Sequence, residues 1–134
     1  MKVHGTPTRT IWPVAGADAV EIIDQTALPY SYRVLRLNSL DDVAQAIRSM
    51  QVRGAPLIGV SAAYGIALAL SRRADDATLL AALQTLAATR PTAVNLHWAL
   101  ARVQACLLPL PAAARAAAAW LEAGRIADED VDQC

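Results

Sequence analysis

The sequence is poor in several residue types, and each shortage excludes a class of protein. Only two cysteines, Cys106 and Cys134, occur among 134 residues, which predicts neither a disulfide framework nor a cysteine metal cluster. Phenylalanine is absent. His4 and His97 lack the spacing of metal ligands, and His97 is expected to be a helix-surface or packing histidine. The sequence contains no dinucleotide fingerprint, phosphate-binding P-loop or serine triad. The residues themselves therefore indicate no metal cluster.

An excess of charge of either sign is also missing. Twelve Lys and Arg balance twelve Asp and Glu, so the net charge gives no attraction to nucleic acid or to an anionic membrane surface. The first residues lack the apolar segment of a secretory signal, and the uncharged run 54–70 is slightly short for a membrane span. We expect a cytoplasmic protein without nucleic-acid or membrane partners, in which the run 54–70 forms a buried helix.

The sequence is rich in alanine and changes its periodicity once. Three early segments carry the Val, Ile, Thr and Tyr typical of strands, at 9–12, 19–23 and 30–37, and glycine or proline separates them. These segments predict a small antiparallel sheet, and the alternation in the third strand predicts one face in water. After Asn38 the apolar residues recur at helical spacing instead.

The first two predicted helices have clear starting signals. Ser39 and Asp42 resemble a capping box, and the helix that follows runs to about Met50. Pro56 suits the first turn of a second helix, because its missing N–H would be unpaired there, and this helix runs to about Ser71. Three small residues four apart leave one side of the second helix open to close approach by another element. They are Gly59, Ala63 and Ala67.

The third and fourth helices are indicated by caps and by one apolar face. Asp75 or Asp76 caps the third helix, and Thr92 caps the fourth. The apolar positions are Leu79, Leu80, Leu83 and Leu86 in the third helix, and Leu96, Leu100, Val103 and Leu107 in the fourth. Their spacing of three and four residues predicts that each set faces the core.

The fifth helix is predicted to be short. It covers the alanine-rich residues 112–123 and ends at Gly124, because glycine is common just after a helix C-terminus. An acidic segment from Ile126 then begins a new helix, and its acidic side chains are expected in water rather than on a metal. They are Asp128, Glu129, Asp130 and Asp132. The predicted fold class is α+β: a small N-terminal antiparallel sheet, with strands to about 37, followed by a bundle of about five helices from about 39.

Two arginines stand directly before predicted helix starts and are candidates for binding an anion. Arg53 opens the segment Arg-Gly-Ala-Pro at 53–56, and Arg90 precedes Pro91. A helix N-terminus presents unpaired N–H groups and a partial positive charge, which favour an anion. If the second and fourth helices pack in parallel, both arginines and both helix ends converge on one anion. The alternative for each arginine is a solvated or capping side chain.

Six motifs occur in order along nearly the whole chain. They are Arg-Thr-Ile-Trp at 9–12, Asp-Gln at 24–25 with Leu-Pro at 28–29, Ala-Ile at 46–47 with Met50, Val-Arg-Gly-Ala-Pro at 52–56 with Ile-Gly-Val at 58–60, Ala-Ala-Tyr-Gly at 62–65 and Arg-Pro-Thr-Ala-Val-Asn-Leu at 90–96. Together they resemble the N-terminal domain of the methylthioribose-1-phosphate isomerase family. The resemblance implies that Arg53, Gly54, Ala55 and Arg90 bind a sugar phosphate. It also implies that residues 1–134 are the N-terminal domain of a longer isomerase, whose catalytic cysteine and aspartate lie in a Rossmann-like C-terminal domain absent from this chain.

The same resemblance implies an activity and partners. The family converts 5-methylthioribose 1-phosphate into 5-methylthioribulose 1-phosphate in methionine salvage, without a metal or organic cofactor, and its full-length members are homodimers. This chain alone is expected to be inactive, because none of its residues matches a catalytic motif. One alternative is a protein of the same architecture, either a ribose-1,5-bisphosphate isomerase or an initiation-factor-2B-like regulatory subunit. The other is a non-enzymatic helical interaction module, which would use the small-residue face of the second helix.

Overall fold

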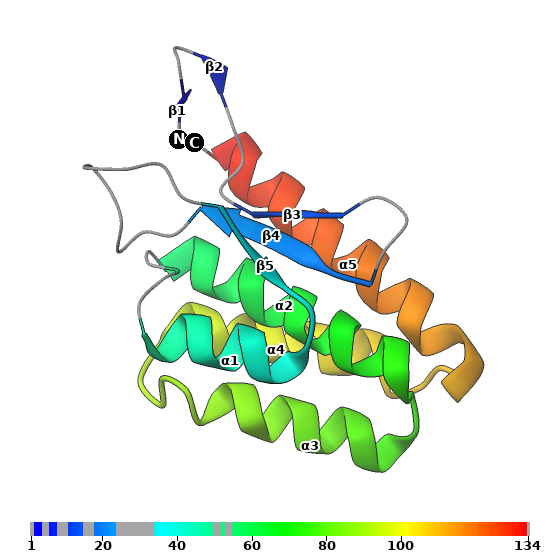
Figure 1. Ribbon diagram of the computed structural model, residues 1–134. Coiled ribbons are helices and arrows are strands. Elements are labelled where there is room, and N and C mark those ends of the chain that lie inside the picture. Colours follow the sequence, from blue (N-terminus) through cyan, green and yellow to red (C-terminus); the bar gives the residue numbers. More distant parts are fainter. Residues whose placement is uncertain are drawn as a thin grey trace.

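A small antiparallel sheet lies beside a bundle of five helices (Figure 1). The computed structural model describes residues 2–3, 6–7, 11–14, 18–23, 34–49, 52 and 55–133. The first two strands, β1 (Lys2–Val3) and β2 (Thr6–Pro7), pair only with each other. The main sheet has the order β3-β4-β5, formed by β3 (Ile11–Pro13), β4 (Val20–Ile23) and β5 (Val34–Leu37). The predicted α+β class and antiparallel sheet are confirmed.

The main sheet has one face in the core and an opposite face that carries polar side chains as well as the buried Ile23, because successive side chains of a strand point to opposite sides. On the polar face, Trp12 Nε1 donates a hydrogen bond to Glu21 Oε1 at 3.1 Å, and Arg36 Nη2 donates to Glu21 Oε2 at 3.5 Å. The register places Glu21 between these two partners. The opposite face contributes to the core, through Ile11, Val20, Ile22 and Leu37. In β5 the exposed residues alternate with less exposed ones, as predicted.

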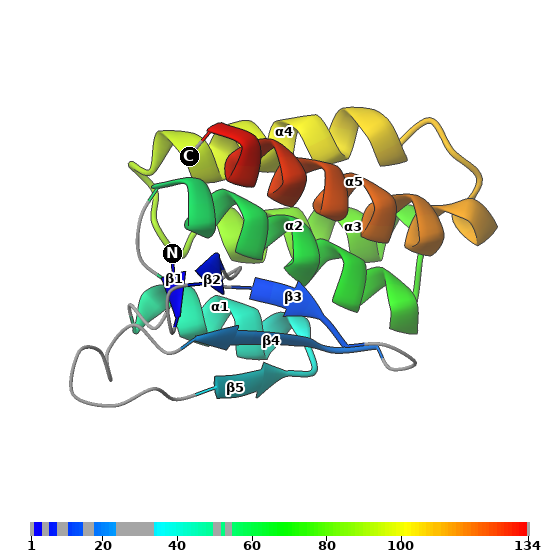
Figure 2. The same ribbon diagram turned by 90° about the horizontal axis from the view of Figure 1, so that it is seen from above.

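The five helices alternate in direction (Figures 1 and 2). They are α1 (Leu40–Arg48), α2 (Ala55–Arg72), α3 (Asp76–Ala87), α4 (Val94–Leu107) and α5 (Ala112–Gln133). Short loops join successive helices, so neighbours along the chain run in opposite directions. As a result α2 and α4 run one way, and α1, α3 and α5 run the other way.

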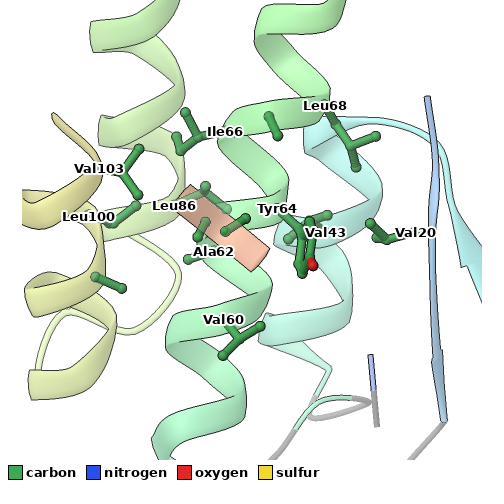
Figure 3. Close-up of a cluster of buried hydrophobic side chains, with 14 of the residues drawn as sticks. Val20, Val43, Val60, Ala62, Tyr64, Ile66, Leu68, Leu86, Leu100 and Val103 are labelled. Carbon is green, nitrogen blue, oxygen red and sulfur yellow. The ribbon is translucent and has the colours of Figure 1, made fainter. Parts of the chain in front are cut away.

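Helix α2 is the centre of the bundle. Every residue from Leu57 to Leu70 is buried, and α2 packs against each of the other four helices. Figure 3 shows Tyr64 and Leu68 of α2 beside Val43 of α1 and Val20 of β4. A helix that is apolar on all sides must be surrounded, either by protein or by lipid. Here protein surrounds it, as predicted; among the described residues no helix is long and apolar enough to cross a membrane.

The predicted start of α1 is confirmed with one difference. Ser39 Oγ accepts a hydrogen bond from the N–H of Asp42 at 3.2 Å, which satisfies one of the free donors of the first turn. In return, the N–H of Asn38 donates a hydrogen bond to the carboxylate of Asp42 at 2.9 Å. In a standard capping box the donor would be the N–H of the next residue, Ser39. In α3, Asp75 occupies the predicted cap position, but its side chain caps no backbone N–H.

The predicted end of α5 at Gly124 is wrong, because the helix continues without a break to Gln133. Past the glycine, Ile126 and Ala127 are buried in the core, so packing outweighs the weak helix propensity of Gly124. An ion pair adds to this: both Nη atoms of Arg102 in α4 bind the carboxylate of Glu129, at 2.8 and 2.6 Å. These hydrogen bonds lower the pKa of Glu129.

The predicted apolar faces of α3 and α4 need one correction. Leu80 is 42% exposed, and Ala82 takes its place in the core beside Leu79, Leu83 and Leu86. All four predicted residues of α4 are buried. The exposure of Leu80 follows from helix geometry, because a residue adjacent to Leu79 in sequence points about 100° away from it.

A buried arginine joins the ends of three helices. Arg115 of α5 is only 4% exposed, and its guanidinium donates to three carbonyl oxygens at 3.0 to 3.1 Å. These are the carbonyls of Leu107 and Leu108 at the C-terminus of α4, and of Ala74 beyond the end of α2. Its Nη2 also lies 2.6 Å from Asp76 Oδ1 of α3. The cation thus lies at the negative end of α4, where the helix dipole favours it.

Candidate anion-binding site

The N-termini of α2 and α4 lie side by side at one end of the bundle (Figures 1 and 2). Gly59, in the second turn of α2, permits this approach. A Cβ atom placed on Gly59 would be 3.0 Å from the carbonyl oxygen of Asn95 and 3.3 Å from Cβ of Ala99. The parallel packing on which the predicted anion site depended is therefore confirmed, as is close approach at the first of the three small residues.

The start of α4 has no side-chain cap. The predicted cap residue, Thr92, is one position too early, and the N-cap is Ala93, whose methyl group cannot accept a hydrogen bond. Neither α2 nor α4 has an acidic residue in its first turn, whereas α1 and α3 do. Alanine is among the poorest N-cap residues, because it leaves the first N–H groups of the helix to water or to a ligand. The partial positive charge at this end is thus not neutralised by the residues described there.

Arg90 is presented by a tight turn between α3 and α4. The N–H of Ala93 donates to the carbonyl of Arg90 at 3.1 Å, which closes a four-residue turn with Pro91 in its second position. Proline favours that position, because its ring fixes φ near the value the turn requires. On the other side, the N–H of Thr89 donates to the carbonyl of Leu86 at 3.1 Å, so Arg90 follows α3 almost directly.

The Nε atom of Arg90 has no hydrogen-bond partner among the described residues. Within the part of the chain that the structure describes, its Nε is the one buried side-chain nitrogen or oxygen without a hydrogen bond. An unpaired buried donor costs about 1–3 kcal/mol, so such groups are rare in folded proteins and call for an explanation. An oxyanion held between the guanidinium and the N–H groups of α4 would satisfy both.

The structure locates two of the four predicted site residues. Arg90 lies at the entrance to α4, and Ala55 is the first residue of α2. Arg53 and Gly54 lie outside the described residues. The neighbouring Val52 is buried, and its N–H donates to the carbonyl of Ala46 at 3.4 Å. Val52, the residue before Arg53, is therefore anchored to α1.

One residue of this region has a contact that sequence reasoning missed. His97 lies on the surface of α4, one of its two predicted settings, but its Nε2 is 2.9 Å from the carbonyl oxygen of Pro91. The six-residue spacing between Pro91 and His97 corresponds to no known motif, so only the fold reveals the contact. Cys106 is a partly buried free thiol near the C-terminus of α4, at the opposite end of that helix from Arg90.

Metal ligands do not gather near this site. Among the side chains that the structure describes, no group of three or more His, Cys, Asp or Glu residues could hold a metal ion. The acidic Asp128 and Glu129 are exposed on α5 rather than at a helix start, because α5 runs through them.

Sequence comparison relates the chain to one protein family. The model of the Initiation factor 2 subunit family matches residues 51–133. Methylthioribose-1-phosphate isomerase of Methylorubrum populi is 59% identical over all 134 residues, and the match covers 37% of that protein. The Rhodospirillum rubrum protein of the same name is 57% identical over 98% of this chain and 34% of its own length. The chain therefore spans little more than a third of these relatives.

Two solved structures share the fold. Translation initiation factor eIF-2B, subunit delta, from A. fulgidus superposes with a TM-score of 0.83 at 36% sequence identity, over 93% of this chain and 38% of that one. The 5-methylthioribose 1-phosphate isomerase of Pyrococcus horikoshii superposes with a TM-score of 0.81, also at 36% identity, over 90% of this chain and 36% of that one. The fold alone does not separate an initiation factor from an isomerase.

Proposed function

The chain belongs to the Initiation factor 2 subunit family, and on this premise we propose that it is the substrate-binding, N-terminal part of an aldose–ketose isomerase. The reaction is the conversion of 5-methylthioribose 1-phosphate into 5-methylthioribulose 1-phosphate, a step of methionine salvage. Residues 1–134 form the N-terminal domain of this longer enzyme, which acts in the cytoplasm as a homodimer. The names and the 55–59% identity of the curated relatives support this substrate.

The unpaired Nε of Arg90 is the observation that carries the proposal. It lies at the entrance to α4, whose N-cap has no side-chain acceptor. A phosphate group offers several acceptor oxygens, which match the fork of a guanidinium and the N–H groups of a helix start. We infer that Arg90 and the start of α4 hold the phosphate, and that Arg53, Gly54 and Ala55 complete the site from the start of α2.

The chemistry itself is assigned to the part of the enzyme beyond this chain. The contribution of this domain is to fix the phosphate, so that the reacting carbons are positioned and water is excluded. The chain alone should therefore bind the substrate without converting it. No step requires a metal or an organic cofactor from this domain.

A phosphorus NMR titration of 5-methylthioribose 1-phosphate with this chain tests the proposal. We expect the phosphate signal to shift or broaden with no ketose signal over time. Arg90→Ala should weaken binding by about tenfold or more, because a hydrogen bond to a charged group contributes about 1.5–3 kcal/mol. Arg73→Ala is the matched control, since Arg73 is exposed and lies far along the chain from this turn.

Three results would contradict the proposal in different ways. If the phosphate signal does not change, the chain has no phosphate site of its own. If Arg90→Ala binds as tightly as the wild type, the site is elsewhere. If the ketose forms, a residue of this chain is catalytic.

The initiation-factor alternative rests on the structural likeness to the A. fulgidus protein. It predicts no change of the phosphate signal, and the same titration therefore separates it from the isomerase proposal.

A further inference from the structure

We propose that His97 is a positioning residue for Arg90: its imidazole fixes the turn 90–93 to α4 and so holds the Arg90 guanidinium where a phosphate can reach it. This inference rests on the proposed function, because it assigns the residue that prepares the same site. The contact between His97 Nε2 and the carbonyl oxygen of Pro91, at 2.9 Å, carries it.

The direction of this hydrogen bond is fixed by chemistry. A carbonyl oxygen can only accept, so Nε2 of His97 must carry a proton. Of the two neutral forms of the ring, only the one with its proton on Nε2 makes this bond. The contact is therefore a donated hydrogen bond from a side chain of α4 to the backbone of the turn that precedes it.

The backbone of His97 is held in place, because it belongs to the helix that follows the turn. Its own backbone N–H donates to the carbonyl of Ala93 at 3.2 Å, in the first turn of α4. The ring thus reaches back from a fixed point to the carbonyl of Pro91, six positions earlier in the chain. The two hydrogen bonds of His97 join the start of α4 to the turn at two different carbonyls.

The restrained residue is the one that directly follows Arg90. The pyrrolidine ring of Pro91 already fixes φ, and a peptide bond is planar, so ψ is the only soft backbone angle left at this residue. Holding the Pro91 carbonyl restrains ψ. The N–H of Ala93 holds the carbonyl of Arg90 at 3.1 Å. With both carbonyls held, the backbone that carries Arg90 is set before a ligand arrives, and less conformational entropy is lost on binding.

Three variants separate the hydrogen bond from the packing of the ring. His97→Phe keeps a ring of similar size and removes the donor. His97→Gln removes the ring but keeps an N–H donor the same number of bonds from the backbone, and should recover the function. Gln104→Phe is a control for an added aromatic ring on α4, because Gln104 lies on the same helix, seven residues or about two turns beyond His97.

The experiment is the phosphorus NMR titration of the full chain with 5-methylthioribose 1-phosphate, combined with amide hydrogen exchange of the free protein. His97→Phe should bind about three- to tenfold more weakly, as expected for one neutral hydrogen bond. In His97→Phe, the amide hydrogen of Ala93 should exchange faster than in the wild type. The urea concentration at the unfolding midpoint should stay close to that of the wild type. His97→Gln should restore most of the affinity and of the exchange protection. Nitrogen NMR of the neutral wild-type ring should show the proton on Nε2.

The outcomes distinguish this inference from the proposed function. If the wild type does not bind the substrate, the proposed function fails, and the positioning role fails with it. If the wild type binds and His97→Phe binds equally well, only the positioning role is overturned. A loss of affinity in His97→Phe that His97→Gln does not recover also overturns it, because the ring rather than its hydrogen bond would then matter.

Discussion

Replacing Gly59 by alanine should destabilise the protein, whereas the same replacement at Gly124 should stabilise it. Both glycines lie in helix interiors, Gly59 in α2 and Gly124 in α5. A Cβ at Gly59 would meet the backbone oxygen of Asn95 at 3.0 Å and Cβ of Ala99 at 3.3 Å. A Cβ at Gly124 would meet nothing within 4 Å. The two sites therefore differ in available space and agree in secondary structure.

The expected magnitude follows from the two local environments. In a helix interior, glycine is less favourable than alanine by about 1 kcal/mol, so Gly124→Ala should raise the free energy of unfolding by about 0.5–1 kcal/mol. Gly59→Ala gains the same amount, but overpacking a close contact costs about 1–3 kcal/mol. The gain in helix propensity is the same in the two variants. The difference between their free energies of unfolding, about 1–3 kcal/mol, therefore measures the steric cost where α2 crosses α4.

Urea denaturation of both variants and the wild type gives this difference directly. The urea dependence (m value) should be unchanged, because neither substitution alters the surface exposed on unfolding. Gly59→Ala should also weaken phosphate binding, since the added methyl group separates the two helix starts, whereas Gly124→Ala should not. If Gly59→Ala is as stable as Gly124→Ala, the close approach of α2 to α4 is not a real constraint, and the geometry of the site loses its basis.

Two further predictions concern groups that the fold places at helix ends. Arg115→Met should lower the free energy of unfolding by about 3 kcal/mol in urea denaturation, because three hydrogen bonds from a buried charged donor are lost while water recovers only part of them. The matched Arg73→Met, at a side chain that is 77% exposed, should change it by less than about 0.5 kcal/mol, and equal effects would contradict the reasoning. Ala93→Asp should stabilise the free chain by about 0.5–2 kcal/mol, since it supplies the missing N-cap of α4. The same carboxylate should weaken phosphate binding in the NMR titration, and tighter binding would show that the phosphate does not use this helix start.

Local signals in the sequence predicted most of the fold. The cap at Ser39 and the proline at the start of α2 act within one or two turns, so they mark helix starts independently of packing. The apolar face of α4 was equally clear, because its period is that of a helix. In contrast, the passage of α5 through Gly124 depends on burial of Ile126 and on the contact of Arg102 with Glu129, twenty-seven residues apart. Contacts between residues so far apart leave no pattern in a short stretch of sequence.

The candidate site could be predicted only in part for the same reason. The residue types before the two helix starts indicated an anion, and the order of motifs indicated a family. The parallel packing of α2 and α4 is a property of the whole bundle, which the sequence does not determine locally. The structure shows it through the close approach of Gly59 to the carbonyl oxygen of Asn95. The missing cap at Ala93 and the contact of His97 with Pro91 depend on single positions and on the path of one turn. Sequence alone could not assign either of them.

The strongest argument for a ligand is that three unfavourable features lie together. A glycine in the helix interior at 59, an alanine as the N-cap at 93 and an unpaired guanidinium nitrogen at Arg90 each cost about 1 kcal/mol or more. Five other described arginines, Arg36, Arg73, Arg102, Arg115 and Arg125, have carboxylate partners, and two more, Arg48 and Arg72, are exposed to water. Local conflicts of this kind concentrate at functional sites, because a bound ligand can resolve them together. A phosphate would accept from the guanidinium and from the uncapped helix, and the glycine lets α2 and α4 bring both starts to it.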